Sequence, residues 1–132
     1  MKGKISHINL SISNIERSIE FYNQLLFPIG FKKGLNESGK WGAVRGYKGK
    51  DVELEIIHDR AIKYKPFTRY VGLNHICFEV DTKKDVDKMY KLVKTLGVKI
   101  TRKPRKYPSY TKRYYAFYFR DPDGIPLEIA LV

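Results

Sequence analysis

The sequence has a single cysteine, Cys77, and no run approaching the roughly 20 apolar residues of a membrane-spanning helix. One cysteine excludes an internal disulfide and a cysteine-based zinc cluster. Residues 1–7 lack the apolar core of a signal peptide, so we expect a cytoplasmic protein with no membrane partner. With 42% hydrophobic residues in 132, the chain is too apolar for intrinsic disorder and long enough for one domain, 1–132.

Acidic residues are absent from one long segment. Between Lys88 and Arg120 there are eleven basic residues and no acidic ones, whereas the rest of the chain is almost neutral, with 15 basic and 14 acidic residues. Such a segment attracts anions, although it is also typical of a solvated surface in a lysine-rich chain. No helix-turn-helix, zinc-finger or RNA-recognition motif accompanies the charge, so we expect a small anionic molecule and no nucleic acid.

The chain contains an internal repeat with an offset of 68 residues, which places His7 over His75. Segments 7–12 and 75–80 then align, and both alternate apolar and polar residues as half-buried strands do. The repeat predicts two copies of one supersecondary unit.

Each repeated strand is followed by a helix start and then by further strands. Ser13-Asn14-Ile15-Glu16 forms a capping-box pattern, and Thr82-Lys83-Lys84-Asp85 resembles one. Segment 36–39 is typical of a turn. The predicted later strands are 41–47, 52–57, 98–102, 114–119 and 127–131.

These elements predict an α+β fold made of two βαβββ modules. The modules span 1–60 and 73–132, and segment 61–72 links them. A unit of this size leaves one sheet face uncovered. We therefore expect the two modules to combine around a shared concave surface.

Histidine and glutamate recur at equivalent places in the two modules. His7 and His75 open the first strands, Glu53 and Glu55 share a face of the last strand of the first module, and Glu128 lies in the last strand of the second. A carboxylate in an apolar strand is costly unless it is paired. The pattern predicts a mixed nitrogen and oxygen site for a divalent ion, with coordination positions left for a substrate. The alternative is satisfied strand histidines and ordinary edge carboxylates.

Several motifs resemble the vicinal oxygen chelate superfamily, which includes glyoxalase I, fosfomycin-resistance proteins, extradiol dioxygenases, methylmalonyl-CoA epimerase and bleomycin-resistance proteins. The resemblance covers nearly the whole chain. The motifs are His7-Ile8-Asn9-Leu10, SIEFY at 18–22, Gly72-Leu73-Asn74-His75-Ile76, and Phe119-Arg120-Asp121-Pro122-Asp123-Gly124 followed by Leu127-Glu128.

The resemblance implies a glyoxalase-like half-barrel around a central cavity and a homodimer. It implies that His7, Glu55, His75 and Glu128 hold one divalent ion, either Zn, Ni, Mn or Fe, with Glu53 as the other choice for the fourth ligand. If neither Glu53 nor Glu55 is a ligand, a site of two histidines and one glutamate remains, as in fosfomycin-resistance proteins. It also implies catalytic roles for Glu55 and Glu128, because a glutamate at the ion moves a proton α to a carbonyl in glyoxalase-like reactions.

The expected function is that of a metal-dependent lyase, isomerase or transferase, glyoxalase I-like, acting on a small anionic oxygen-chelating substrate. The alternatives are a fosfomycin-type thiol transferase and a metal-free small-molecule binding protein. Segment 104–115 is expected to be a loop in which Lys112 or Arg113 pairs with the substrate anion, although it also suits an ordinary solvated loop. Tyr118 would face the cavity if Phe117 and Phe119 face the helix.

Overall fold

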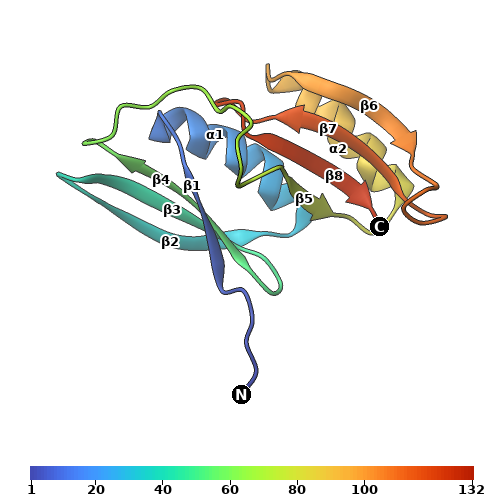
Figure 1. Ribbon diagram of the computed structural model, residues 1–132, viewed down its shortest axis with the longest axis horizontal. Helices are drawn as coiled ribbons and strands as arrows, with labels where there is room; N and C mark the ends of the chain where they lie inside the picture. The colour runs from blue at the N-terminus through green and yellow to red at the C-terminus, as the bar shows by residue number, and fades with distance from the viewer. The chain divides into compact units, whose positions relative to one another are not determined.

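Two four-stranded sheets, each with one helix, make up the computed structural model, which describes all residues 1–132 (Figure 1). Each sheet belongs to one of two compact units, unit 1 (Met1–Lys65) and unit 2 (Pro66–Val132). Both units run strand, helix, strand, strand, strand along the chain. The predicted α+β class with two βαβββ modules is therefore confirmed.

Unit 1 has the strand order β1-β4-β3-β2, in which β1 is parallel to β4 and the other neighbours are antiparallel. Its elements are β1 (His7–Ser11), α1 (Ile15–Leu26), the short 3-10 helix η1 (Phe27–Ile29), β2 (Lys32–Gly39), β3 (Gly42–Lys48) and β4 (Glu53–Asp59).

Helix α1 begins one residue later than the capping-box pattern predicts. Asn14 is the N-cap, and its side-chain oxygen accepts a hydrogen bond from the backbone N–H of Arg17 at 2.9 Å. Ser13 instead accepts a hydrogen bond from the Arg17 guanidinium at 3.0 Å. The helix covers one sheet face and packs Tyr22 against Tyr47, both of them buried.

The turn predicted at 36–39 is wrong, because these residues lie inside β2 and the hairpin turns at 40–41. Strand β2 is an edge strand whose residues are almost all exposed, so it carries no apolar alternation that could signal a strand. It is held by antiparallel pairing with β3 instead.

Unit 2 repeats the topology with the order β5-β8-β7-β6, and β5 is parallel to β8. As predicted, the Thr82 side chain caps its helix by accepting a hydrogen bond from Asp85 N at 3.1 Å. The helix packs on one face of the sheet (Figure 1). The elements are β5 (Ile76–Glu79), α2 (Lys83–Thr95), β6 (Ile100–Lys106), β7 (Tyr115–Arg120) and β8 (Pro126–Leu131).

Strand β6 extends four residues beyond the predicted strand 98–102, and the loop before β7 is correspondingly shorter, at 107–114. The strand contains Pro104, which cannot donate a ladder hydrogen bond. Because β6 is an edge strand with two register shifts, it accommodates the proline. Neither helix is long and apolar enough to cross a membrane.

Candidate functional site

Three neighbouring strands of unit 2 bring a set of polar side chains to the sheet face opposite α2. Glu128 on β8 lies beside Cys77 on β5 and beside Tyr118 on β7 in the strand register. The alternate residues Phe117 and Ile129 are fully buried on the helix side. The side-chain period of two therefore places Tyr118 on the face away from the helix, as expected if Phe117 faces it.

Glu128 is a buried carboxylate surrounded by donors. It is only 1% exposed, and its Oε1 accepts a hydrogen bond from the Tyr114 hydroxyl at 2.8 Å. Its Oε2 lies 2.9 Å from His75 Nε2. Tyr118 and Cys77 also donate to it. These contacts offset the cost of burying a carboxylate in an apolar strand.

His75 is oriented by its neighbour so that one ring nitrogen faces Glu128. Its Nδ1 lies 2.7 Å from Asn74 Oδ1, and its Nε2 lies 2.9 Å from Glu128 Oε2, so each ring nitrogen contacts one acceptor oxygen. A second hydrogen bond of this kind is what a metal-ligating histidine usually has.

His75 Nε2 and Glu128 Oε2 are separated by 2.9 Å, which is the distance of a direct hydrogen bond. Two ligands about 2.1 Å from a tetrahedral ion would lie about 3.4 Å apart. Two of the four predicted ligands are therefore brought together within unit 2.

The two tyrosines and the cysteine around Glu128 stay protonated. Burial, followed by the hydrogen bond to Glu128, raises the pKa of the Tyr114 hydroxyl and of the Tyr118 hydroxyl well above the ordinary tyrosine value. Desolvation by partial burial, followed by the charge of Glu128, raises the pKa of the Cys77 thiol to about 12. Both tyrosines therefore act as donors at neutral pH, and the thiol is a poor nucleophile.

A hollow of about 200 Å³ opens beside His75 on unit 2. Tyr118 contributes to its wall, and three arginines do so as well. The lining residues are Arg69, Asn74, His75, Thr101, Arg102, Tyr110, Tyr118, Phe119, Arg120, Pro126 and Leu127.

The loop 107–114 is partly a packing element. Tyr107 is 7% exposed and packs on Ala116 and Ala130, and its hydroxyl has no hydrogen-bond partner. Lys112 and Arg113, the basic residues predicted to bind substrate, are exposed in this loop and are not among the residues that line the hollow.

Unit 1 carries the other predicted ligands on strands β1 and β4. In the parallel register His7 lies beside Glu53, and Asn9 lies beside Glu55. His7 is exposed, and its Nδ1 lies 3.3 Å from Ser6 Oγ. Because paired residues of neighbouring strands point to the same side, these four side chains share one sheet face.

The Glu53 side chain lies over β3 and β2. Its Oε1 accepts a hydrogen bond from the backbone N–H of Leu35 at 3.0 Å, at the register shift in the β2–β3 pair. It passes over Gly34 and Gly46, where an added Cβ would lie 1.9 and 2.1 Å from Glu53 Oε1. The strand order places β1 on the opposite side of β4. The Glu53 carboxylate is thus turned away from His7.

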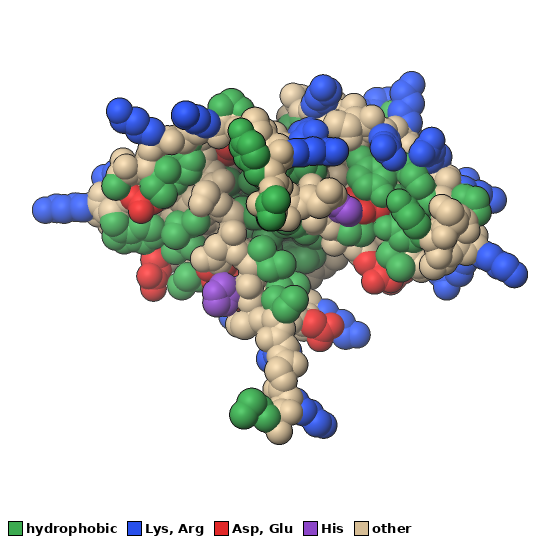
Figure 2. Space-filling model, viewed as in Figure 1, with side chains coloured by type: hydrophobic (Ala, Val, Ile, Leu, Met, Phe, Trp, Pro, Cys, Tyr) green, Lys and Arg blue, Asp and Glu red, His purple; other side chains and the backbone are tan.

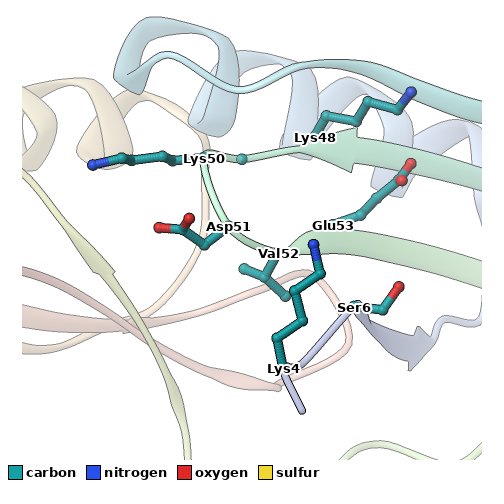
Figure 3. Close-up of a pocket in the computed structure, with 8 residues that line it drawn as sticks. Lys4, Ser6, Lys48, Lys50, Asp51, Val52 and Glu53 are labelled. Carbon is teal, nitrogen blue, oxygen red and sulfur yellow. The ribbon is translucent and has the colours of Figure 1, made fainter. Parts of the chain in front are cut away.

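A second hollow, also about 200 Å³, lies at the end of the unit 1 sheet around the turn 49–52. Lys4, Lys48 and Lys50 line it (Figure 3). The close-up shows Lys50 pointing to one side and Lys48 to the other, so their ammonium groups do not converge on one point. Two carboxylates, Asp51 and Glu53, also line this hollow, so it is not a built anion site.

Neither unit by itself gathers three or more His, Cys, Asp or Glu side chains into a group that could hold a metal ion. His75 and Glu128 contact each other in unit 2, and His7 and Glu55 lie on the polar face of unit 1.

The sequence model of the Glyoxalase/Bleomycin resistance protein/Dioxygenase superfamily matches residues 4–129. The chain belongs to this superfamily. The resemblance drawn from the sequence motifs is thereby confirmed.

Two curated relatives align with almost the whole chain. An uncharacterised Bacillus subtilis protein, YqjT, is 30% identical over 125 residues, which are 93% of the chain and 94% of that protein. The glutathione transferase FosA of Serratia marcescens is 25% identical over 129 residues, which are 98% of the chain and 81% of FosA.

Solved structures share the glyoxalase-like fold. A glyoxylase/bleomycin resistance protein/dioxygenase domain from Frankia sp. EAN1pec has a TM-score of 0.81 at 20% identity, over 99% of the chain and 98% of that domain. The fosfomycin-resistance protein FosX of Listeria monocytogenes, solved with Mn(II) and sulfate, has a TM-score of 0.72 at 18% identity, over 100% of the chain and 94% of FosX.

The arginines of the unit 2 hollow are the residues that sequence reasoning missed. Arg120 follows Tyr118 by two residues on β7, so the strand period alone would have placed it on the same face. Arg102 lies opposite Tyr118 through a β6–β7 register that shifts twice, and no sequence pattern signals those shifts. Arg69 lies outside the strands.

Proposed function

We propose that the chain is a metal-dependent enzyme in which His7 and Glu55 of unit 1 and His75 and Glu128 of unit 2 hold one divalent ion. Its reaction is a lyase, isomerase or transferase reaction on a small anionic substrate that chelates the ion through neighbouring oxygens, as in glyoxalase I. Zn, Ni, Mn and Fe are the candidate ions, because a mixed imidazole and carboxylate site accepts all of them.

The observation that carries the proposal is the pairing of His75 Nε2 with Glu128 Oε2 at 2.9 Å. A buried carboxylate and an imidazole with its second nitrogen hydrogen-bonded form the usual first half of a catalytic metal site. The Glu53 carboxylate already accepts a hydrogen bond from the backbone N–H of Leu35, whereas Glu55 accepts no such bond. This difference favours Glu55 as the fourth ligand. The Mn(II) in FosX of Listeria monocytogenes supports the class of ion.

Each residue then has a defined task. A divalent ion at this place supplies Lewis-acid polarisation of a substrate oxygen. Tyr114 holds Glu128 by a hydrogen bond to Oε1, and Asn74 fixes the ring of His75. Glu55, which is half-buried, takes a proton from the carbon next to a substrate carbonyl and returns it.

The proposal treats 1–132 as one domain in which modules 1–60 and 73–132, with the linker 61–72, complete the site. It includes a homodimer, in which each site takes its two halves from one chain or from both. The mass of the protein in solution tests the dimer.

A fosfomycin-type thiol transferase is the second candidate. The 25% identity to FosA of Serratia marcescens over 98% of the chain favours it. Turnover of fosfomycin with a thiol, set against turnover of hemithioacetals by the same metal-loaded protein, separates this transferase from a glyoxalase I-like lyase.

The experiment is metal analysis of the purified, reconstituted protein together with single variants. We expect about one ion per chain in the wild type and strong loss in His7→Ala, His75→Ala, Glu55→Gln and Glu128→Gln. Glu53→Gln tests the choice of the fourth ligand, and it should retain the ion.

The matched control is His58→Ala, the third histidine of the chain. His58 stacks on Tyr64 and contacts the carbonyl of Ile12, so its loss disturbs packing without touching the proposed ligands. A wild type that binds none of the four ions after reconstitution would contradict the enzyme proposal and leave a metal-free binding protein.

A further inference from the structure

The unit 2 hollow has positive charge without any compensating negative charge. Arg69, Arg102 and Arg120 line it, and no aspartate or glutamate does. Glu128 contacts His75 but is only 1% exposed and is not among the lining residues. Basic side chains also gather on the surface over the β6–β7 end of unit 2 (Figure 2). The hollow is therefore an electropositive recess beside a proposed metal ligand.

The positively charged residues of the hollow are all arginines. Only eight of the 26 basic residues in the chain are arginine, yet all three basic residues of the hollow are arginine. A solvated face of this chain would present lysines. The planar guanidinium donates two parallel hydrogen bonds to one phosphate or carboxylate group, which an ammonium does not do.

Two of the guanidinium groups are held in place by neighbouring contacts. That of Arg102 lies 5.7 Å from the ring centre of Tyr118, which itself lines the hollow. Arg120 donates one hydrogen bond, through Nη1, to the carbonyl of Gly124 at 2.9 Å, and its guanidinium has five N–H donors in all.

The volume of about 200 Å³ is below the roughly 300–1,000 Å³ of pockets that hold drug-sized ligands. The occupant is therefore compact. The rings of Tyr110 and Tyr118 provide an apolar wall for a short carbon chain.

We propose that the substrate carries a second anionic group, a phosphate or a carboxylate, remote from the oxygens that chelate the metal. Arg102 and Arg120 bind this group, and Arg69 adds to their field. The substrate is thus a compact molecule with a chelating end and a charged end. The chelating end rests on the function proposed above, whereas the arginine recess lies within unit 2 and can be tested without metal.

The first test measures binding of inorganic phosphate to the metal-free protein by calorimetry at low ionic strength. We expect binding by the wild type and at least about a tenfold loss in Arg102→Gln and in Arg120→Gln. Arg102→Lys, which keeps the charge but cannot donate two parallel hydrogen bonds to one anionic group, should recover only part of the affinity. Lys103→Gln is the matched control, because Lys103 is exposed on the same strand and does not line the hollow.

Either of two results would overturn the recess as an anion site. One is a wild type that does not bind phosphate, and the other is equal binding by the two arginine variants and by Lys103→Gln. Thermal unfolding of each variant shows whether it is folded. If Arg120→Gln unfolds because the hydrogen bond from Arg120 to Gly124 is lost, Arg102→Gln still tests the recess.

The second test uses metal-loaded protein and three probes that share a 2-hydroxycarboxylate end. Glycerate has no second anionic group, malate adds a carboxylate, and 3-phosphoglycerate adds a phosphate. We expect malate or 3-phosphoglycerate to bind at least about tenfold more tightly than glycerate, with the advantage lost in Arg102→Gln. Equal affinity for all three probes refutes the second anionic group. If the wild type takes up no metal, the proposed function fails. Phosphate binding by the metal-free protein still tests whether the recess binds anions.

Discussion

Tyr114 holds the buried carboxylate of Glu128, so Tyr114→Phe tests how that carboxylate is positioned. The substitution removes one oxygen atom and leaves the ring, which packs against Tyr107 and Tyr110. What is lost is the hydrogen bond from the Tyr114 hydroxyl to Glu128 Oε1 at 2.8 Å.

The size of the effect follows from burial. A hydrogen bond to a charged group contributes about 1.5–3 kcal/mol, and Glu128 is 1% exposed, so water does not replace the lost donor. We expect the free energy of unfolding in urea to fall by about that amount. We also expect the affinity for a divalent ion to fall about 10–100-fold, the usual cost of removing the hydrogen bond that supports a metal ligand.

The matched control is the next residue. The Tyr115 hydroxyl also donates to a carboxylate at 2.8 Å, that of Asp87, but the pair lies on the helix side of the sheet and is only half-buried. Tyr115→Phe should cost about 0.5–1.5 kcal/mol of stability and leave metal affinity unchanged. Metal affinity of Tyr114→Phe within about twofold of wild type, measured by titration of the folded variant, would refute the argument that Tyr114 positions Glu128.

Three further predictions concern stability, each measured by urea unfolding. Burial raises the pKa of Tyr47 from 10 to about 12, so the folded chain keeps a proton that the unfolded chain loses. The resulting stability is complete below pH 10 and is lost between pH 10 and 12, by an amount on the order of 2 kcal/mol, and Tyr47→Phe should show a shallower fall. Gly46→Ala places a Cβ 2.1 Å from Glu53 Oε1 and 2.7 Å from Leu35 N, and should cost about 1–3 kcal/mol, whereas Gly3→Ala, with open space around it, should cost nothing measurable. Tyr107→Phe removes a buried hydroxyl that has no partner, so it should leave stability unchanged or raise it slightly; a loss above about 1 kcal/mol would show that the hydroxyl is bonded.

The repeated modules could be predicted because their signals are local. The alternation in 7–12 and 75–80 and the cap at Thr82 depend only on residues close in sequence. The same alternation placed Glu128 and Tyr118 on the face opposite the helix, since a period of two is enough to assign a face once the apolar side is known.

The parts that could not be predicted depend on pairing between strands. Strand β2 has few apolar residues and exists because β3 pairs with it, so its own residues suggest a turn. In the segment 88–120, with its eleven basic residues, the sequence favours Lys112 and Arg113 for the anion and does not indicate Arg102 and Arg120, which line the hollow. Which basic residue faces the hollow is decided by the β6–β7 register and its two shifts, and no local pattern contains that information.

The central claim is that His75 and His7 bind one ion and His58 does not. Titration of the isotope-labelled wild type with Mn²⁺, followed through the imidazole signals in NMR spectra, tests it without any substitution. We expect substoichiometric Mn²⁺ to broaden the signals of His75 and His7 together and to leave those of His58 sharp. Equal broadening of all three histidines, or of none, would contradict the account.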